Sequence, residues 1–208
     1  MEYFSRTLLS APSVAARVAR LPDCYNQCHL VITSVKRTRA TSLLLLLGAL
    51  PAFAGQMQVA WPPGWDVQAL PSPEGTGVTR ERAVRADANG DPEMIVELTQ
   101  TPLEAGHAVN LEAVVLQMRK VTQVNLQRQG YQSACTPVKA GTLGRQASAQ
   151  TTCEIVLNGG HVMTQTLVAA SGEDTAWSLS YAGTVAGYAA HQAEVDGIRN
   201  SLVLGTPP

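Results

Sequence analysis

Two cysteines, Cys135 and Cys153, are the residues of this sequence whose chemistry is easiest to anticipate. Their spacing is far from the C-x-x-C arrangement of redox-active pairs, so we do not expect them to catalyse thiol exchange. In an exported chain, an even pair most simply forms one structural disulfide, and two free buried thiols are the alternative. Near the N-terminus, Cys24 and Cys28 resemble half of a metal site, but no second pair completes a set of four ligands.

The histidines and serines lack the spacing of a catalytic or metal site. His107, His161 and His191 follow no H-x-x-x-H or H-E-x-x-H pattern. Ser171 lies in AASGED, which lacks the G-x-S-x-G motif and suits a turn between strands. We therefore expect no catalytic residue, no metal ligand and no cofactor, and we interpret His191 as a partly buried structural histidine. A small hydrolase is the alternative, if His107 or His161 meets a serine and an acid in the folded chain.

The segment DANGD, residues 87–91, has oxygen-bearing side chains at the first, third and fifth positions of a calcium-binding loop. The pattern then fails, because the sixth position holds Pro92 instead of glycine and the twelfth holds Leu98 instead of glutamate. We predict a turn between two strands, without a bound metal.

Weak candidates for ligand binding are Trp61, Trp65 and His161. The two tryptophans flank a Pro-Pro-Gly break and could line an exposed groove, because aromatic side chains anchor interfaces. Packing in the core at one end of a sheet is the interpretation that we favour. Four arginines could gather into a basic patch, although pairing with surface carboxylates explains them more simply: Arg80, Arg82, Arg85 and Arg145.

Residues 36–56, KRTRATSLLLLLGALPAFAGQ, have the three parts of a secretory signal peptide in order: a basic start, an apolar run and an A-x-A triplet. The triplet predicts cleavage between Ala54 and Gly55. A membrane span needs about 20 apolar residues, roughly twice the length of this run. Residues 1–35 have no clear period, and we interpret them as a start site assigned too far upstream, with an unusually long leader as the alternative.

Removal of residues 1–54 leaves 154 residues, 55–208, which is the length of one globular domain. This part has nine Lys and Arg against fourteen Asp and Glu, a net charge of 9 − 14 = −5. An acidic domain without a basic run gives no support to nucleic-acid binding. We expect a periplasmic protein without a membrane span after signal removal, and an extracellular location is the alternative.

Hydrophobic periodicity predicts strands, a helix, a meander of strands and a last helix. A short strand precedes the Pro-Pro-Gly break, and residues 93–101 form a central strand. Residues 77–86 form an edge strand whose charged side chains oppose pairing with another molecule. A helix runs from a cap at Asn110 to a C′ glycine at Gly130. Its predicted apolar face consists of Leu111, Val114, Val115, Met118, Val121 and Thr122.

Residues 131–181 predict about four strands, with turns near Gly144, at 158–160 and at 171–175. Cys135 and Cys153 then fall on strands that pair about the turn near Gly144, and a disulfide fits if they occupy a non-hydrogen-bonded pair. A final helix has Tyr188, Val195, Ile198 and Leu202 at helical spacing. Helices segregated from hairpin-linked strands predict an α+β fold, with an antiparallel sheet of about six strands and two main helices.

Several phrases together resemble a family of small exported bacterial proteins that is known only as a domain of unknown function. The resemblance covers essentially all of residues 57–204, and its phrases read WPPGW, PEMIVELTQTPLE, NLEAVVLQMRK, GYQSAC, NGGHVMTQTLVAA, WSLSYAG and IRNSLVL. The layout is more distantly similar to the PsbP-like fold, in which P-x-G-W follows the first strand and I-x-x-S-L ends the last helix. That resemblance implies a sandwich that acts as a binding, assembly or chaperone-like module.

Together these observations predict a non-catalytic binding or adaptor module of the cell envelope, with a protein or an envelope component as its partner. Besides the small hydrolase, a second alternative is an immunity or chaperone partner of a secreted effector. Fold-level similarity is weak support for any of these functions, because one fold serves many purposes.

Overall fold

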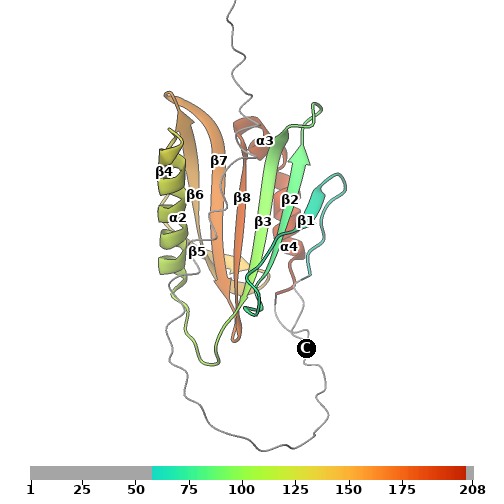
Figure 1. Ribbon diagram of the computed structural model, residues 1–208, viewed down its shortest axis with the longest axis vertical. Helices are drawn as coiled ribbons and strands as arrows, with labels where there is room; N and C mark the ends of the chain where they lie inside the picture. Colours follow the sequence, from blue (N-terminus) through green and yellow to red (C-terminus); the bar gives the residue numbers. More distant parts are fainter. Residues whose placement is uncertain (1–57, 205–208) are drawn as a thin grey trace, which may run out of the picture.

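The computed structural model of the chain describes residues 58–204 (Figure 1). The predicted extension 1–35, the signal peptide 36–54 and the Ala54–Gly55 cleavage site lie outside the described residues. In chain order the elements are β1 (Asp66–Ala69), β2 (Thr79–Ala86), β3 (Pro92–Pro102), α2 (Leu111–Arg128), β4 (Gln132–Cys135), β5 (Lys139–Leu143), β6 (Gln146–Leu157), β7 (Gly160–Ser171), β8 (Thr175–Thr184), α3 (Val185–Ala190) and α4 (Gln192–Ser201).

The strands form one antiparallel sheet in the order β1-β2-β3-β8-β7-β6-β4, with β5 also pairing with β6. The predicted α+β class with an antiparallel sheet is confirmed, and the sheet has eight strands instead of about six. One reason is that β4 and β5 share the edge of β6. The predicted first strand was misplaced: Gln58 makes only an isolated bridge to Val203, and β1 follows the Pro-Pro-Gly break. Because β1 pairs with β2, residues 79–86 are not the edge strand.

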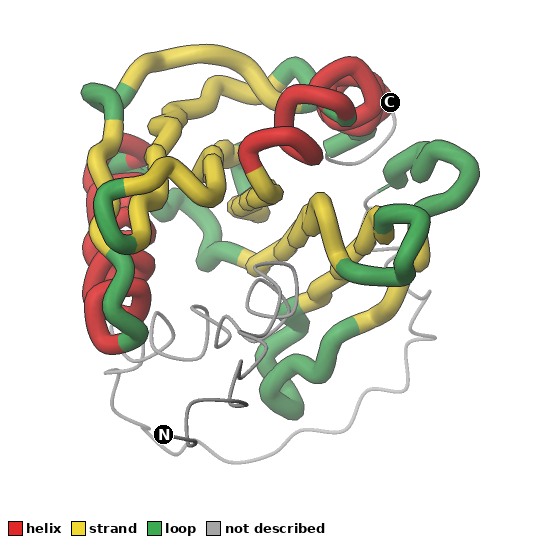
Figure 2. Tube along the Cα trace, turned by 90° about the horizontal axis from the view of Figure 1, so that it is seen from above, coloured by secondary structure: helices red, strands yellow, loops and turns green. Residues whose placement is uncertain are grey.

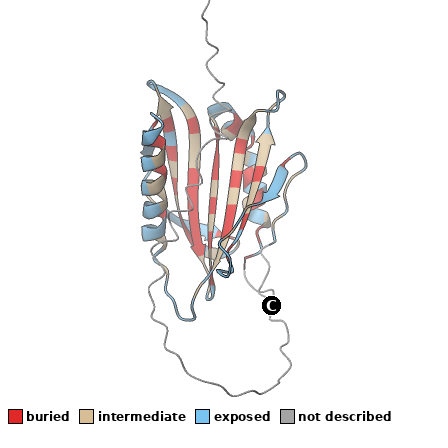
Figure 3. Cartoon of the chain, in the orientation of Figure 1, coloured by how far each residue is buried: buried red, intermediate tan, exposed pale blue. Residues whose placement is uncertain are grey.

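The helices lie on opposite faces of the sheet (Figure 2). Neighbouring residues of a strand point to opposite faces of the sheet, so each face has its own core. On one face, Val115 of α2 packs against Ala149 and Ala169, which are a register pair of β6 and β7. Val195 and Ile198 of α4 belong to the larger core on the other face, which includes Val96, Leu98 and Leu179. Figure 3 shows the buried residues concentrated along the central strands β3, β8 and β7.

Helix α2 begins and ends as the sequence predicts. The Asn110 side chain accepts a hydrogen bond of 3.0 Å from the backbone N–H of Ala113, and Gly130 follows the helix with φ +85°. Its apolar face was predicted too broadly: Val115, Thr122 and Leu126 are buried, whereas Val114 is 37% exposed. The helix packs on Ala149 and Ala169 and covers β4, β6 and β7, and only a narrow stripe of its surface is buried.

The last helix is divided at His191 into α3 and α4, where a single helix was predicted. The Thr184 hydroxyl caps α3 by accepting a hydrogen bond of 2.9 Å from the N–H of Gly187. Helix α3 lies so close to β3 that a Cβ on Gly187 would overlap the Glu93 carbonyl, and one on Gly183 would lie 2.6 Å from the same oxygen. The sequence G-x-x-x-H therefore places His191 one helical turn beyond this contact, above β3.

Two hairpins are closed by two-residue turns with positive φ at both central positions. Asn158 and Gly159 (φ +51° and +80°) join β6 to β7, as predicted. Gly144 and Arg145 (φ +52° and +68°) join β5 to β6. A Cβ on Gly144 would also lie 2.6 Å from Leu204 Cγ and 2.8 Å from the Leu202 carbonyl oxygen, whereas one on Gly159 would meet nothing within 4 Å.

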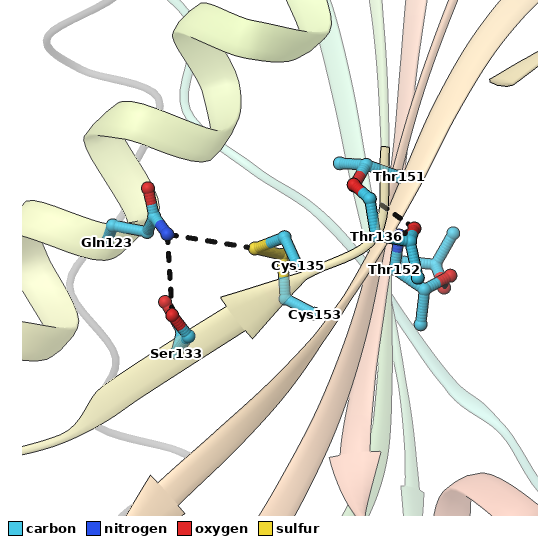
Figure 4. The surroundings of a disulfide bond; sticks show 8 residues. Gln123, Ser133, Cys135, Thr136, Thr151, Thr152 and Cys153 are labelled. Atoms are coloured by element: carbon cyan, nitrogen blue, oxygen red, sulfur yellow. Dashed lines mark hydrogen bonds between the residues drawn. A yellow bond between two sulfur atoms is a disulfide. The ribbon is translucent and has the colours of Figure 1, made fainter. Parts of the chain in front are cut away.

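The predicted disulfide between Cys135 and Cys153 is present, and the two residues face each other in the β4–β6 register (Figure 4). In the neighbouring pair, the N–H of Thr136 donates to the carbonyl of Thr152 at 2.9 Å. Hydrogen-bonded pairs alternate with non-hydrogen-bonded pairs, so the cysteines occupy a non-hydrogen-bonded pair as expected. The Gln123 amide donates toward Ser133 O and Cys135 Sγ, which ties α2 to this edge of the sheet.

Loss of the disulfide should destabilise the domain without changing its fold. The bond closes a loop with a sequence separation of 18 residues, so we expect the C135S/C153S variant to lose about 3 kcal/mol of unfolding free energy. Urea unfolding in a C24S/C28S background measures this difference. In the same background, thiol titration without reductant should find no free cysteine, and two reactive thiols would contradict the bond.

Glycine at position 144 should matter more than glycine at position 159. Alanine at either site has to adopt a left-handed conformation at a cost of about 1–2 kcal/mol, but only G144A also forces a side chain against Leu202 and Leu204. We expect G144A to lose about 2–4 kcal/mol of unfolding free energy. Thermal and urea unfolding of both variants test this, and equal losses would show that the contact is unimportant.

Candidate functional site

Two polar clusters lie between the α3–α4 segment and the sheet. The first, which we call the histidine clamp, consists of Trp65, Glu93, His191 and Glu194. The His191 ring bonds Glu93 Oε1 through Nε2 at 2.7 Å and Glu194 Oε1 through Nδ1 at 3.1 Å. The Trp65 indole N–H donates to Glu194 Oε2 at 2.5 Å, and its ring meets the His191 ring edge-on at 6.2 Å. The clamp thus joins β3, the junction of α3 and α4, and the loop before β1.

The electrostatics of the clamp favour a protonated histidine between two carboxylates. Burial alone would lower the pKa of His191, but its hydrogen bonds to Glu93 and Glu194 outweigh burial and raise that pKa above 6.5. Burial alone would raise the pKa of Glu194, but hydrogen bonds from Trp65 and His191 hold it below 4.5, with Arg85 adding to the effect. The clamp is a structural ion-pair network, in agreement with the interpretation of His191 as a structural residue.

The second cluster, which we call the Tyr–Arg cluster, consists of Gln150, Thr152, Thr166, Tyr181, Tyr188 and Arg199. Arg199 of α4 donates from Nη1 to the Tyr181 hydroxyl and from Nη2 to Gln150 Oε1, each at 2.8 Å. The guanidinium also lies 5.8 Å from the centre of the Tyr181 ring, within cation–π range. The Tyr181 and Tyr188 rings stack with their centres 5.7 Å apart.

Three hydroxyls continue the Tyr–Arg cluster across the sheet. Thr166 Oγ1 is 2.6 Å from the Tyr188 hydroxyl and 2.8 Å from Thr152 Oγ1. The sheet register explains this row, since Thr152 pairs with Thr166 and Thr166 pairs with Tyr181. Burial, despite the opposing hydrogen bond from Thr166, raises the pKa of Tyr188 to about 12, so its hydroxyl stays protonated at neutral pH.

Arg199 has only neutral partners among the residues that the structure describes. Its hydrogen bonds go to a phenol and an amide, and the other side-chain oxygens of the cluster, beyond these two partners, are hydroxyls. Thr166 and Tyr181 are buried, whereas Gln150, Thr152, Tyr188 and Arg199 are half-buried, so the cluster borders solvent. A cation removed from water without a carboxylate is unfavourable, which distinguishes this cluster from the histidine clamp.

The residues predicted as weak binding candidates do not lie in one place. Trp65 is 8% exposed and belongs to the larger core, and Trp61 packs against the same core while donating to Glu81 Oε2 at 3.3 Å. Both follow the core-packing interpretation. His161 lies at the start of β7, where its ring bonds the Met163 carbonyl and the Thr164 hydroxyl. A binding role for these three residues stays a prediction.

The four arginines do not form one patch on the sheet. Arg80 and Arg82 are two residues apart on β2 and therefore lie on the same face of the sheet, whereas Arg85 lies on the opposite face. Arg82 Nε donates to Glu97 at 2.6 Å, and Arg85 donates to the Pro63 carbonyl at 3.2 Å. Arg145 lies in the β5–β6 turn. At Arg82, pairing with a surface carboxylate is therefore the better description.

In the DANGD turn, the Asp87 carboxylate is engaged by the backbone. Its Oδ1 accepts hydrogen bonds of 2.9 Å from the N–H of Asp91 and 2.8 Å from the N–H of Asn89. The bond from Asp91, followed by that from Asn89, lowers the pKa of the Asp87 carboxyl. The segment forms a hydrogen-bonded turn between β2 and β3, as predicted.

Sequence reasoning missed both polar clusters as units. Only local signals were available: Glu194 follows His191 by one helical turn, and Tyr188 and Arg199 are eleven residues apart, or three turns. Glu93 and Gln150 are 98 and 49 residues away from their partners. No spacing rule reaches across such distances, and the pairing follows from the sheet order instead.

Comparisons with known proteins identify a family. A family model described as a domain of unknown function (DUF4946) matches residues 56–204. No curated protein matches the chain. The solution structure of a cyanobacterial PsbP from Synechocystis is similar at 12% identity, with 76% of this chain and 97% of that one covered and a TM-score of 0.49. LpqN of Mycobacterium tuberculosis, described as involved in cell envelope biogenesis, is similar at 20% identity, with 76% and 87% covered and a TM-score of 0.45.

In the part of the chain from residue 58 to residue 204, none of the helices combines the length and the apolar character needed to cross a membrane.

The histidine clamp predicts a specific pH dependence of stability. The raised pKa of His191 means that its contribution is complete below pH 6.5 and is lost as the pH rises through the folded-state value. The lowered pKa of Glu194 means that its contribution is complete above pH 4.5 and is lost as the pH falls. We therefore expect H191Q to lose about 1.5–3 kcal/mol of unfolding free energy near pH 5.5, and less near pH 9.

Urea unfolding of the wild type and H191Q across this pH range measures the difference. The matched control is H161Q, because the His161 ring contacts a carbonyl and a hydroxyl instead of carboxylates. For H161Q the loss should be small at every pH. A loss for H191Q that grew with rising pH would contradict a protonated clamp.

Proposed function

The chain belongs to the DUF4946 family, a domain of unknown function, and we propose that it acts as a non-catalytic binding module of the bacterial cell envelope. Two observations support the location. The segment 36–54 has the pattern of a cleavable signal peptide, and Cys135 and Cys153 form a disulfide, which persists in oxidising compartments such as the periplasm. The partner in this proposal is a protein or another envelope component.

The composition of the Tyr–Arg cluster carries the proposal of binding. In it, polar side chains from β6, β7, β8, α3 and α4 converge around the guanidinium of Arg199 and reach the border with solvent. Such a set can hold a ligand through hydrogen bonds and one charge. It includes no histidine, carboxylate or thiol, and so lacks a base that could activate one of its hydroxyls.

The histidines of the described chain do not supply that base elsewhere. His191 is held between Glu93 and Glu194, without a hydroxyl among its hydrogen-bond partners. The ring of His161 meets a hydroxyl but no carboxylate in the described residues. His107 bonds to the Glu104 carbonyl through its backbone N–H, and its ring makes no hydrogen bond within residues 58–204. No observation therefore favours a hydrolase over a binding module.

The location is tested by expressing the full chain with a C-terminal tag in a bacterial host and separating periplasm from cytosol. We expect a periplasmic protein whose first residue is Gly55 and whose two remaining cysteines are bonded to each other. A cytosolic protein with an intact Met1 and reduced thiols would contradict the proposed location and the signal peptide together.

Binding is tested by crosslinking the tagged protein in intact cells and identifying what it captures from the envelope. We expect one or a few components that are retained in high salt, and no hydrolysis of ester or amide substrates by the purified protein. Hydrolysis that survives purification and disappears in a variant of one histidine would overturn the non-catalytic proposal.

A further inference from the structure

We infer that the Tyr–Arg cluster is a binding site for a carboxylate group, which Arg199 recognises together with one hydroxyl of the Tyr181–Tyr188–Thr166–Thr152 row. This inference rests on the proposed binding role and names the chemistry of the ligand at the same cluster. Within residues 58–204, the cluster has more hydrogen-bond donors than acceptors.

The guanidinium of Arg199 has five N–H donors, of which one on Nη1 and one on Nη2 are used by Tyr181 and Gln150. Both partners are neutral and lie within the sheet, so they fix the orientation of the guanidinium without neutralising its charge. Among residues 58–204, the remaining donors have no hydrogen-bond partner, and the positive charge meets the face of the Tyr181 ring but no carboxylate. Because Arg199 is half-buried, water compensates this charge less well than at an open surface.

The hydroxyl row is also short of acceptors. The Tyr181 hydroxyl, which accepts from Arg199, is also hydrogen-bonded to Tyr188, so Tyr181, Tyr188, Thr166 and Thr152 form one row of four hydroxyls. The three hydrogen bonds within this row use three of its four hydroxyl protons, so one proton at one end remains to be donated. Farther along the same face of β6, the hydroxyl of Ser148 is buried without a hydrogen-bond partner in the described structure.

A group that only accepts hydrogen bonds and carries one negative charge would pair with the unused donors and neutralise the charge of Arg199. An ionised carboxylate does both, and its two oxygens match the planar fork of a guanidinium. A phosphate dianion fits less well, because Arg199 is the only cationic side chain in the cluster and the region 55–208 has a net charge of −5. Small acids, peptides and acidic sugars all carry such a carboxylate, and the chemistry of recognition is the same for each.

The test follows the Arg199 side chain directly by NMR. We expect its Nε–Hε signal, assigned by its loss in R199K, to shift saturably when sodium acetate replaces sodium chloride at constant ionic strength. The R199Q variant lacks this signal, so its affinity is measured from the backbone amide signals of the cluster residues, and we expect it to bind acetate at least tenfold more weakly. The matched control is R128Q, since Arg128 occupies the last turn of α2 as Arg199 occupies the last turn of α4, and it should bind like the wild type.

The source of the carboxylate is distinguished by two further titrations. Acetyl-alanyl-alanine is compared with its C-terminal amide, and glucuronate is compared with glucose. Tighter binding of the peptide acid than of acetate assigns a peptide ligand, and tighter binding of glucuronate assigns a glycan. In each pair the neutral analogue should leave the Arg199 signal unchanged.

Three results would overturn the inference: a shift that grows linearly without saturation, an equal affinity of R199Q and the wild type, or an equal response to an acid and its neutral analogue. Because R199Q also loses two internal hydrogen bonds, its thermal unfolding is measured in parallel, and the wild-type signal decides if that variant does not fold. Capture of envelope components that persists with R199Q would leave the proposed binding module standing while refuting the carboxylate site.

Discussion

The close contact between helix α3 and strand β3 determines where most of the polar side chains lie. Gly183 and Gly187 allow the helix backbone to approach the Glu93 carbonyl to a distance that any larger residue would prevent. From that contact, one turn of helix brings His191 over the Glu93 side chain, and Tyr188 lies beside Tyr181. Helix α4 starts at the clamp, and Arg199 in its last turn bonds to side chains of β6 and β8. Both polar clusters therefore depend on glycine, which has no side chain, at positions 183 and 187.

The two clusters show how the same environment can serve stability and binding. In the histidine clamp the His191 ring is shared between two carboxylates, so both of its nitrogens are bonded and the network holds the α3–α4 segment to the sheet. In the Tyr–Arg cluster one charge is held by neutral groups, which orient it and leave it available. The difference comes from which residues the sheet register places under the helices, namely glutamate at the start of β3 and polar neutral residues on β6 and β7.

Local patterns predicted local structure well. The Asn110 cap, the Gly130 terminator, the Asn158–Gly159 turn and the Cys135–Cys153 pair all depend on residues close in sequence or joined by one hairpin, and all are confirmed. Errors arose where the outcome depends on distant partners. The first strand lies after the Pro-Pro-Gly break because it pairs there with β2. The last helix is divided at His191, whose ring bonds to Glu93. The candidate site was not predicted, because Arg199 meets Gln150 only through the order β8-β7-β6.

The division of one long edge into β4 and β5 has a consequence for the behaviour of the protein at high concentration. The inner strands β2, β3, β8, β7 and β6 have between 8 and 12 residues, whereas β1, β4 and β5 at the margins have only 4 or 5. A short margin offers few unpaired amides and carbonyls in a row, and so it is a poor template for a strand from another molecule. The interruption between β4 and β5, where Thr136 bonds to Thr151 and Thr152, thus disfavours intermolecular sheet growth and amyloid-like aggregation.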